Sequence, residues 1–307
     1  MKPLVALLLA VLLPSSAAQA WSRPGHMVTA AIAYDELSAQ DRRVIDKIVA
    51  LAEKHPDRGA FEVAVGRATG EERGRRLFLE LARWPDDARG SIHDHPTWHY
   101  WSRPIVDRSS PPPQSPKDVP EGSAYEAFVL NLSVAADSRA SAGERAVALA
   151  WLFHLVGDMH QPLHSVSQVS KRFPEGDRGG SLQFVLDPVE KKPITLHWYW
   201  DDSVSRDGEP ELAFKRADDL MRRVPRTQFM LQPFKSATEF SEWAKESYQL
   251  GNTVAYGPDL RASDSASTAP EQSKRYVDQS LEVGEQRLTL AGYRLTEVLR
   301  WVFRNER

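Results

Sequence analysis

Two pairs of histidine and aspartate residues have a spacing that could bind a metal ion. His154 and Asp158 are four residues apart in an apolar stretch, and His197 and Asp201 repeat this spacing. On a helix, residues four apart lie on one face with Cβ atoms roughly 5–6 Å apart, so an imidazole and a carboxylate can reach one cation. In a chain of this composition such pairs also arise by chance, so the spacing alone is a weak motif.

The surroundings of the first pair favour a metal site over a chance pair. His154 and Asp158 lie in a run that includes Trp151, Phe153 and Val156. An ionised carboxylate among such side chains is costly unless a cation or hydrogen bonds compensate for it. We therefore predict a cation beside Asp158.

Four further residues could extend this site. His26 lies six residues after the first twenty, Asp86 follows Trp-Pro, His99 lies between two aromatic residues, and His164 follows Asp158 by six. A single histidine beside aromatic residues is more often a core or surface residue than a ligand. We apply that interpretation to the remaining histidines, which are His55, His93, His95 and His160.

The composition excludes several kinds of chemistry. The chain has 307 residues and no cysteine, which removes disulfides, thiolate nucleophiles and cysteine-type zinc sites. Its formal net charge of -3 offers no basic surface for duplex phosphates or anionic lipid. A metal site must therefore use histidine and carboxylate ligands, and phosphate chemistry must obtain its positive charge from the metal.

The first twenty residues have the pattern of a secretory signal peptide. Lys2 provides a positive charge, residues 4–13 are apolar but too short to span a membrane, and Ala18-Gln19-Ala20 fits a signal-peptidase site. We therefore expect residues 1–20 to be removed, leaving a mature domain of residues 21–307 that begins at Trp21. Export without cysteine favours a secreted or periplasmic bacterial protein over a eukaryotic one.

Most of the remaining chain has helical periodicity, which predicts one all-α domain. Capping signals at Ser38 with Asp41 and at Ser141 with Glu144 mark two helix starts. The proline-rich stretch 89–120 is expected to form a long loop, and 181–186 with 194–200 a small β-hairpin, the only sheet. The expected helices cover 26–37, 39–52, 73–82, 124–135, 145–160, 211–223, 236–254 and 271–303.

The order of these motifs resembles the zinc-dependent class I nuclease family, which includes fungal single-strand nucleases and plant bifunctional nucleases. The most specific part is HLVGDMHQPLH at 154–164, an H-x3-D-x5-H motif with Gln-Pro-Leu before the last histidine. The segments around Trp21, Asp86, His99 and His197 follow the same order, and WAKES at 243–247 and AGYRL at 291–295 resemble later helices of the family. The resemblance covers nearly the whole mature chain and implies the all-helical fold shared with bacterial zinc phospholipases C.

The resemblance also implies a site with three Zn²⁺ ions. It assigns Asp86, His99, His154 and Asp158 to the first zinc. The α-amine and carbonyl oxygen of Trp21, with His26 and again Asp158, would bind the second. His164, His197 and Asp201 would bind the third. Nitrogen and oxygen ligands suit Zn²⁺, and sites with three protein ligands leave positions open for water and a phosphate oxygen.

Further roles follow from the same resemblance. Asp86 would also orient the attacking water, Arg89 would face the scissile phosphate, and Tyr100 would stack on a base. Ser102 stands where the family has an aspartate that contacts the base, and Ser181 stands where it has an asparagine. These two departures affect base preference.

We therefore expect a secreted trinuclear-zinc endonuclease that hydrolyses single-stranded RNA and DNA and could have 3′-nucleotidase activity. We expect a monomer whose partner is a nucleic acid or nucleotide, with no stable protein partner. One alternative is a zinc-dependent phospholipase C acting on phospholipid, which the lost base contacts favour and Asp201, in place of the more usual glutamate, disfavours. A second alternative is a zinc-binding protein without turnover, for which closed four-ligand sites would be expected.

Overall fold

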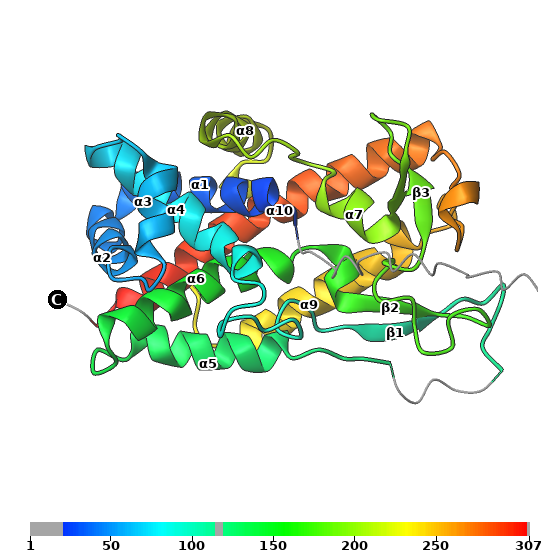
Figure 1. The fold of residues 1–307 in the computed structure, drawn as a ribbon, viewed down its shortest axis with the longest axis horizontal. Helices are drawn as coiled ribbons and strands as arrows, with labels where there is room; N and C mark the ends of the chain where they lie inside the picture. The colour runs from blue at the N-terminus through cyan, green and yellow to red at the C-terminus, as the bar shows by residue number, and fades with distance from the viewer. Residues whose placement is uncertain (1–20, 114–118, 306–307) are drawn as a thin grey trace, which may run out of the picture.

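The described part of the chain in this computed structural model consists of residues 21–113 and 119–305. Residues 1–20, to which the signal-peptide prediction applies, lie outside it. Within it, the structure is predominantly helical, as the periodicity predicted, and it contains two small sheets where one was expected (Figure 1). No helix in these two ranges is both long and apolar enough to cross a bilayer.

Ten α-helices make up most of the described residues. They are α1 Arg23–Gln40, α2 Arg42–Ala52, α3 Arg58–Val65, α4 Gly70–Asp87, α5 Ala124–Ala136, α6 Ala142–Asp158, α7 Leu196–Asp201, α8 Pro210–Arg223, α9 Thr238–Leu250 and α10 Lys274–Phe303. Short helices η1 to η4 cover Pro162–Ser165, Arg226–Phe229, Gly251–Ala255 and Ala266–Thr268. In Figure 1, α10 runs lengthwise through the molecule, with α2 to α4 at one end and α7 with β3 at the other.

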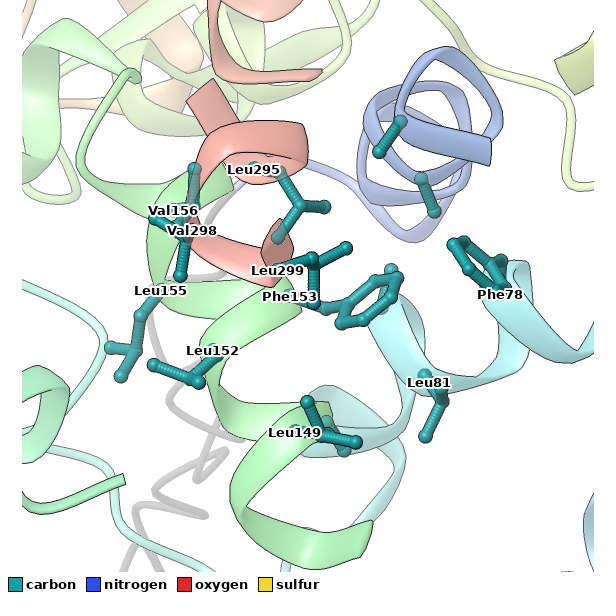
Figure 2. Packing of buried hydrophobic residues seen from close by; sticks show 14 of the residues in the cluster. Phe78, Leu81, Leu149, Leu152, Phe153, Leu155, Val156, Leu295, Val298 and Leu299 are labelled. Atoms are coloured by element: carbon teal, nitrogen blue, oxygen red, sulfur yellow. The ribbon is translucent and has the colours of Figure 1, made fainter. Parts of the chain in front are cut away.

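Helix α6 is the centre of the hydrophobic core. The predicted capping box is present, since Ser141 accepts a hydrogen bond from the Glu144 backbone and the Glu144 side chain returns one to Ser141. From Ala148 to Asp158 every residue is buried, because α4, α5 and α10 pack around the helix. Figure 2 shows side chains of α6, including Phe153 and Val156, beside Leu295 and Leu299 of α10. The histidine and aspartate on α6 are therefore carried by a stretch of helix that is buried on every side.

The strands form two separate two-stranded sheets. The predicted hairpin is present but shorter than expected, with β3 Phe184–Leu186 antiparallel to β4 Pro193–Thr195. The second predicted strand, 194–200, is wrong over most of its length because Leu196–Asp201 forms helix α7. A parallel pair, β1 Arg103–Val106 with β2 Val166–Val169, was not expected, and it places a strand inside the predicted loop 89–120.

One helix start differs from the prediction, and one helix was not predicted. Ser38 does not cap a helix, because α1 continues through it and its hydroxyl donates to the Asp35 carbonyl. The N-cap of α2 is Asp41, and its side chain makes no capping hydrogen bond. Helix α3, Arg58–Val65, was not predicted, and it packs on α4 through the buried side chains of Phe61 and Val65.

Candidate metal centre

The predicted site residues lie on five structural elements and one loop. Helix α1 carries His26, the end of α4 carries Asp86, and the loop before β1 carries His99. Helix α6 carries His154 and Asp158, η1 carries His164, and α7 carries His197 and Asp201. All eight of these side chains are buried, with at most 4% of any residue exposed.

These side chains form three groups that could each hold a metal ion. In each group, one possible ligand atom per residue lies within 4.8 Å of the others. The groups are His26, His154 and Asp158; Asp86, His99 and His154; and His164, His197 and Asp201. The eight residues that the sequence analysis selected for their side chains are thus brought together.

Asp158 belongs to the first group, and its carboxylate also faces the second group. Its Oδ1 is 3.2 Å from His26 Nε2, whereas its Oδ2 is 3.2 Å from His99 Nδ1 and 3.4 Å from His154 Nε2. The two oxygens of one carboxylate therefore face different histidines, which is the arrangement that a bridging ligand requires.

The pair His197 and Asp201 belongs to the third group. The loop of His99 connects this group to the second group. His197 Nε2 is 3.1 Å from His164 Nε2 and 3.6 Å from Asp201 Oδ2. The ring nitrogen Nδ1 of His164 is hydrogen bonded to the carbonyl oxygen of His99, which ties the third group to the second.

Backbone carbonyls fix the orientation of three imidazoles. The Nδ1 atoms of His154, His164 and His197 are within hydrogen-bonding distance of the carbonyl oxygens of Ala82, His99 and Gly179. If Nδ1 donates, the lone pair is on Nε2, the atom that points into the group, and this is the tautomer that metal-binding histidines commonly use.

The end of α6 is held by α9 and α10. The hydroxyl of Ser247 donates to the Met159 carbonyl at 2.6 Å, and Arg287 donates to the His160 carbonyl at 3.3 Å. Helix ends leave carbonyls without intrahelical partners, so these contacts fix the backbone beside Asp158. His160 itself contacts Arg294 and the Val156 carbonyl, and it belongs to none of the three groups.

Burial favours the neutral forms of the histidines and aspartates in the site. It lowers the pKa of His26 and His99 well below the ordinary value, and the neighbouring histidines lower it further. Burial also raises the pKa of Asp158, with a further contribution from Asp86, and it raises that of Asp201. Neutral imidazoles and carboxylates short of a counter-charge are groups that a bound cation would stabilise.

Several polar atoms of the site have no hydrogen-bond partner among the described residues. They are both ring nitrogens of His26, both carboxylate oxygens of Asp158, Oδ2 of Asp86 and Oδ2 of Asp201. Buried polar atoms are normally hydrogen bonded, so a set of unpaired ones on converging histidines and aspartates indicates a missing partner. The positions of these atoms fit one or more cations.

The remaining predicted residues lie around the three groups. Arg89 donates to Asp86 Oδ1 at 3.0 Å. Tyr100 is half-buried, Ser102 is buried, and the hydroxyl of Ser181 is buried without a partner among the described residues.

Trp21 is buried beside the groups that it was predicted to join. Its Cδ1 lies next to Gly157, on the surface of α6 that His26 also contacts, and the backbone N–H of Ser22 donates to the Asp201 carbonyl at 3.3 Å. The free α-amine depends on cleavage in a segment outside the described residues, so it stays a prediction.

Sequence reasoning missed Gln161. Its side chain is fully buried, and Nε2 donates to Asp201 Oδ1 at 2.7 Å. The sequence offered one signal, because a buried amide next to a proline inside a metal-binding motif needs hydrogen-bond partners.

A helical domain with three groups of buried histidine and aspartate that could each hold a metal ion defines a candidate metal-binding protein. The chain belongs to the S1/P1 nuclease family, whose profile matches residues 21–304. A comparison with curated proteins found no match. The expected resemblance to zinc-dependent class I nucleases is thus confirmed at the level of the family, and with it a nuclease that hydrolyses phosphodiester bonds.

Proposed function

We propose that this protein is a trinuclear-zinc endonuclease that hydrolyses single-stranded RNA and DNA after export from a bacterial cell. One observation carries the proposal: three buried groups of histidine and aspartate meet around Asp158 and the loop of His99. Membership of the nuclease family supports a nucleic acid as the substrate.

The residues present fit zinc. The donor set consists only of imidazole nitrogens and carboxylate oxygens, which zinc accepts, and the burial of the histidines keeps them in the neutral form that binds metal. Asp86, His99, His154 and Asp158 would hold one ion; His26, Asp158 and the amino end of Trp21 a second; and His164, His197 and Asp201 the third. When bound, zinc supplies positive charge for the phosphate and lowers the pKa of water.

Asp86 would act on the attacking water, and Arg89 would act on the phosphate. Besides binding the first ion, Asp86 would accept a hydrogen bond from the attacking water and so orient this water toward the phosphorus. Arg89 donates to Asp86 Oδ1, which places its guanidinium beside the metal-binding groups, and a guanidinium there would donate to the phosphate as its charge increases in the transition state.

Tyr100 would select unpaired strands. A base must be unstacked before its face can lie on an aromatic ring, so a stacking residue favours single strands over a duplex. Ser102 and Ser181 replace longer side chains that read base edges in the family, and a site that depends on stacking accepts many sequences.

The decisive experiment is a substrate panel with purified residues 21–307 and zinc. We expect hydrolysis of single-stranded RNA and DNA, slower hydrolysis of duplex DNA and no release of phosphocholine from phosphatidylcholine vesicles. The variant Asp158→Asn, compared at matched fold by circular dichroism, should be inactive. Hydrolysis of phosphatidylcholine without cleavage of nucleic acid would instead establish a phospholipase C, and three bound zinc ions without any turnover a binding protein.

Export and processing are tested separately. Amino-terminal sequencing of protein recovered from the periplasm or the medium should begin at Trp21. Because an amide nitrogen is a much poorer ligand than an amine, a form with one methionine before Trp21 should bind about two zinc ions per chain instead of three and lose most activity. Full activity of the extended form would contradict this assignment of the second zinc.

A further inference from the structure

Trp198 is exposed beside the metal centre. It is the most exposed of the nine tryptophans in the described ranges, with 39% of its surface accessible. Tryptophan is a large apolar residue that folding normally buries to a high degree, and an exposed one beside a site indicates a binding role.

The geometry of α7 places Trp198 at the edge of the third group. His197 and Asp201 are four apart on this helix and face the metal centre together. The side chain at 198 is about 100° further around the axis than that of His197. Three other residues of this helix are buried in a second hydrophobic cluster; they are Leu196, Tyr199 and Trp200. Trp198 therefore lies on the open flank.

Backbone hydrogen bonds fix the place of Trp198 on α7. Its backbone N–H donates to Thr195 Oγ1 at 3.1 Å, and its carbonyl accepts from the Asp202 backbone N–H at 3.1 Å. The backbone N–H of Ser22 donates to the Asp201 carbonyl at 3.3 Å, so this turn of α7 also meets the start of α1. A partly exposed ring on a helix whose backbone is held in this way is presented at a defined place beside the third group.

We propose that Trp198 is a second stacking platform for a nucleobase of the single-stranded substrate, which deepens the proposed function and rests on it. Tyr100 follows His99 of one group and Trp198 follows His197 of another, so the two rings would contact nucleotides on opposite sides of the scissile phosphate. Stacking accepts every base because every base has a π-face. A second platform therefore compensates for the base-edge contacts that Ser102 and Ser181 do not provide.

The neighbours of Trp198 fit a nucleotide better than a membrane. Asp202 and Arg206 lie beside it, with the Arg206 Nε donating to the Asp202 carbonyl at 3.2 Å and its Nη1 to Asp187. A membrane contact would require this charged surface to enter a lipid interface, which is costly. A base needs only one face of the indole and leaves the charged groups in water.

The test compares Trp198→Ala, Trp198→Phe and Trp301→Ala with the wild type. Trp301 is a partly exposed tryptophan near the end of α10, at the other end of the molecule from α7 (Figure 1). Steady-state kinetics use a single-stranded oligonucleotide and bis(4-nitrophenyl) phosphate, a diester without a base. Equilibrium titration measures binding of adenosine 5′-monophosphate and of inorganic phosphate, and circular dichroism confirms the fold.

We expect Trp198→Ala to raise KM for the oligonucleotide at least about fivefold, as loss of one base stack does, with a smaller effect on kcat. The ratio of kcat/KM for the oligonucleotide to that for the base-free diester should fall by the same factor, and affinity for adenosine monophosphate should fall more than affinity for phosphate. Trp198→Phe should recover most of the loss, and Trp301→Ala should leave KM at the wild-type value.

The outcomes separate this inference from the proposed function. Wild-type protein that cleaves the oligonucleotide while Trp198→Ala has an unchanged KM overturns the stacking role alone. Wild-type protein with zinc that cleaves no nucleic acid overturns the proposed function and with it the inference. Binding of wild-type protein, but not Trp198→Ala, to phosphatidylcholine vesicles would identify Trp198 as a membrane contact and overturn the base assignment.

Discussion

At the residue scale, Gln161 determines which oxygen of Asp201 is available to a cation. Its amide donates to Oδ1 at 2.7 Å, while its own carbonyl oxygen accepts from the backbone N–H of Leu163 and fixes the amide. Oδ2 of Asp201 is therefore left toward His197, at 3.6 Å from its Nε2. A hydrogen bond from a neutral donor keeps the carboxylate oriented without competing for the metal.

We predict that Gln161→Leu weakens zinc binding in the third group. Loss of such a supporting partner typically costs 10- to 100-fold in metal affinity or activity. Zinc content after dialysis against a weak chelator should fall from about three toward two per chain. Asn131→Ala is the matched control, because Asn131 is also buried and hydrogen bonded but lies on α5. It should lower stability and keep three zinc ions; equal zinc loss in both variants would contradict the role of Gln161.

The sequence could point to the candidate ligands but not to the groups that support them, and the reason is physical. The i, i+4 pairs and the family motif are local patterns, so His154, Asp158, His197 and Asp201 could be selected without a structure. The partners of their outer atoms are distant, since the carbonyl of Ala82 is 72 positions from His154 and Gln161 is 40 from Asp201. Contacts of this kind depend on the packing of whole helices.

Glu80 gives the fold a pH dependence that does not involve the metal ligands. Burial on α4 raises its pKa to about 7, only partly opposed by Arg83. Because the folded-state pKa exceeds the unfolded value of about 4.5, stability is fully present below pH 4.5 and is lost as pH rises through 7. We predict that Glu80→Gln removes this loss. On going from pH 4.5 to pH 8, the free energy of unfolding of wild type should fall relative to that of the variant by up to about 3 kcal/mol.

Urea unfolding of the zinc-loaded protein at both pH values checks this expectation. Asn131→Ala serves as the reference variant, since an amide does not titrate and its cost should be the same at both pH values. An equal difference between Glu80→Gln and wild type at pH 4.5 and pH 8 would show that the Glu80 carboxyl is not desolvated in solution.

At the element scale, α7 shows where periodicity misleads. The run from Ile194 to Trp200 is rich in aromatic residues, which favour strands, so a strand was predicted. Thr195 instead accepts a hydrogen bond from the Trp198 backbone and starts a helix. Only this helix makes the His197 and Asp201 spacing useful, because residues four apart in a strand are about 13 Å apart. The chemistry of the site thus identified the element better than propensity did.

The pairing of β1 with β2 could not be predicted for a different reason. The two strands are short, and their register joins residues about sixty positions apart, such as Arg103 with Val166. Short strands carry little periodic signal, and a parallel pairing of this kind depends on where α5 and α6 place the chain between them. This pair holds the segment after His99 beside the segment after His164.

Helix packing at the site requires a glycine on α6. A Cβ built on Gly157 would lie 2.7 Å from Nδ1 and 2.9 Å from Cε1 of the buried His26. His26 is stacked on His154 at 3.8 Å between ring centroids, so it cannot retreat without losing that contact. The close approach of α1 to α6 depends on glycine having no side chain at position 157. The position of His26 beside Asp158 depends on it as well.

We predict that Gly157→Ala destabilises the protein by about 1–3 kcal/mol, a typical cost of overpacking, and removes one of the three zinc ions. Gly143→Ala is the control on the same helix, because its Cβ would meet only the Lys54 carbonyl at 3.5 Å, an ordinary contact. Alanine favours a helix over glycine, so this control should be neutral or slightly stabilising. Zinc content and urea unfolding measure both effects; three zinc ions in Gly157→Ala would show that α1 can shift and keep its ligand.

At the scale of the whole molecule, the metal centre joins elements that are far apart in the sequence. The first group links α1 to α6, the second adds the end of α4 and the loop of His99, and the third adds η1 and α7. The hydrophobic core packs α1, α4, α6 and α10 together, while α7 belongs to a second cluster. Bound cations would therefore connect the two clusters and stabilise the folded state as well as take part in the chemistry.

We predict that zinc removal lowers the thermal midpoint by at least about 5 °C. A ligand present at 100 times its Kd stabilises by about 2.7 kcal/mol per site, and each kcal/mol shifts the midpoint of a domain of this size by about 2–4 °C.

Asp158→Asn should reduce this difference between zinc-loaded and chelated protein, because it removes the carboxylate that faces two of the groups. Asp187→Asn is the control: Asp187 is equally buried but is held by Arg206 and two backbone N–H groups outside the metal centre. It should lower the midpoint with and without zinc and preserve the difference. An equal midpoint for chelated and zinc-loaded wild type would mean that the three groups are stable without a cation, and the unpaired atoms of Asp158 would then need another partner.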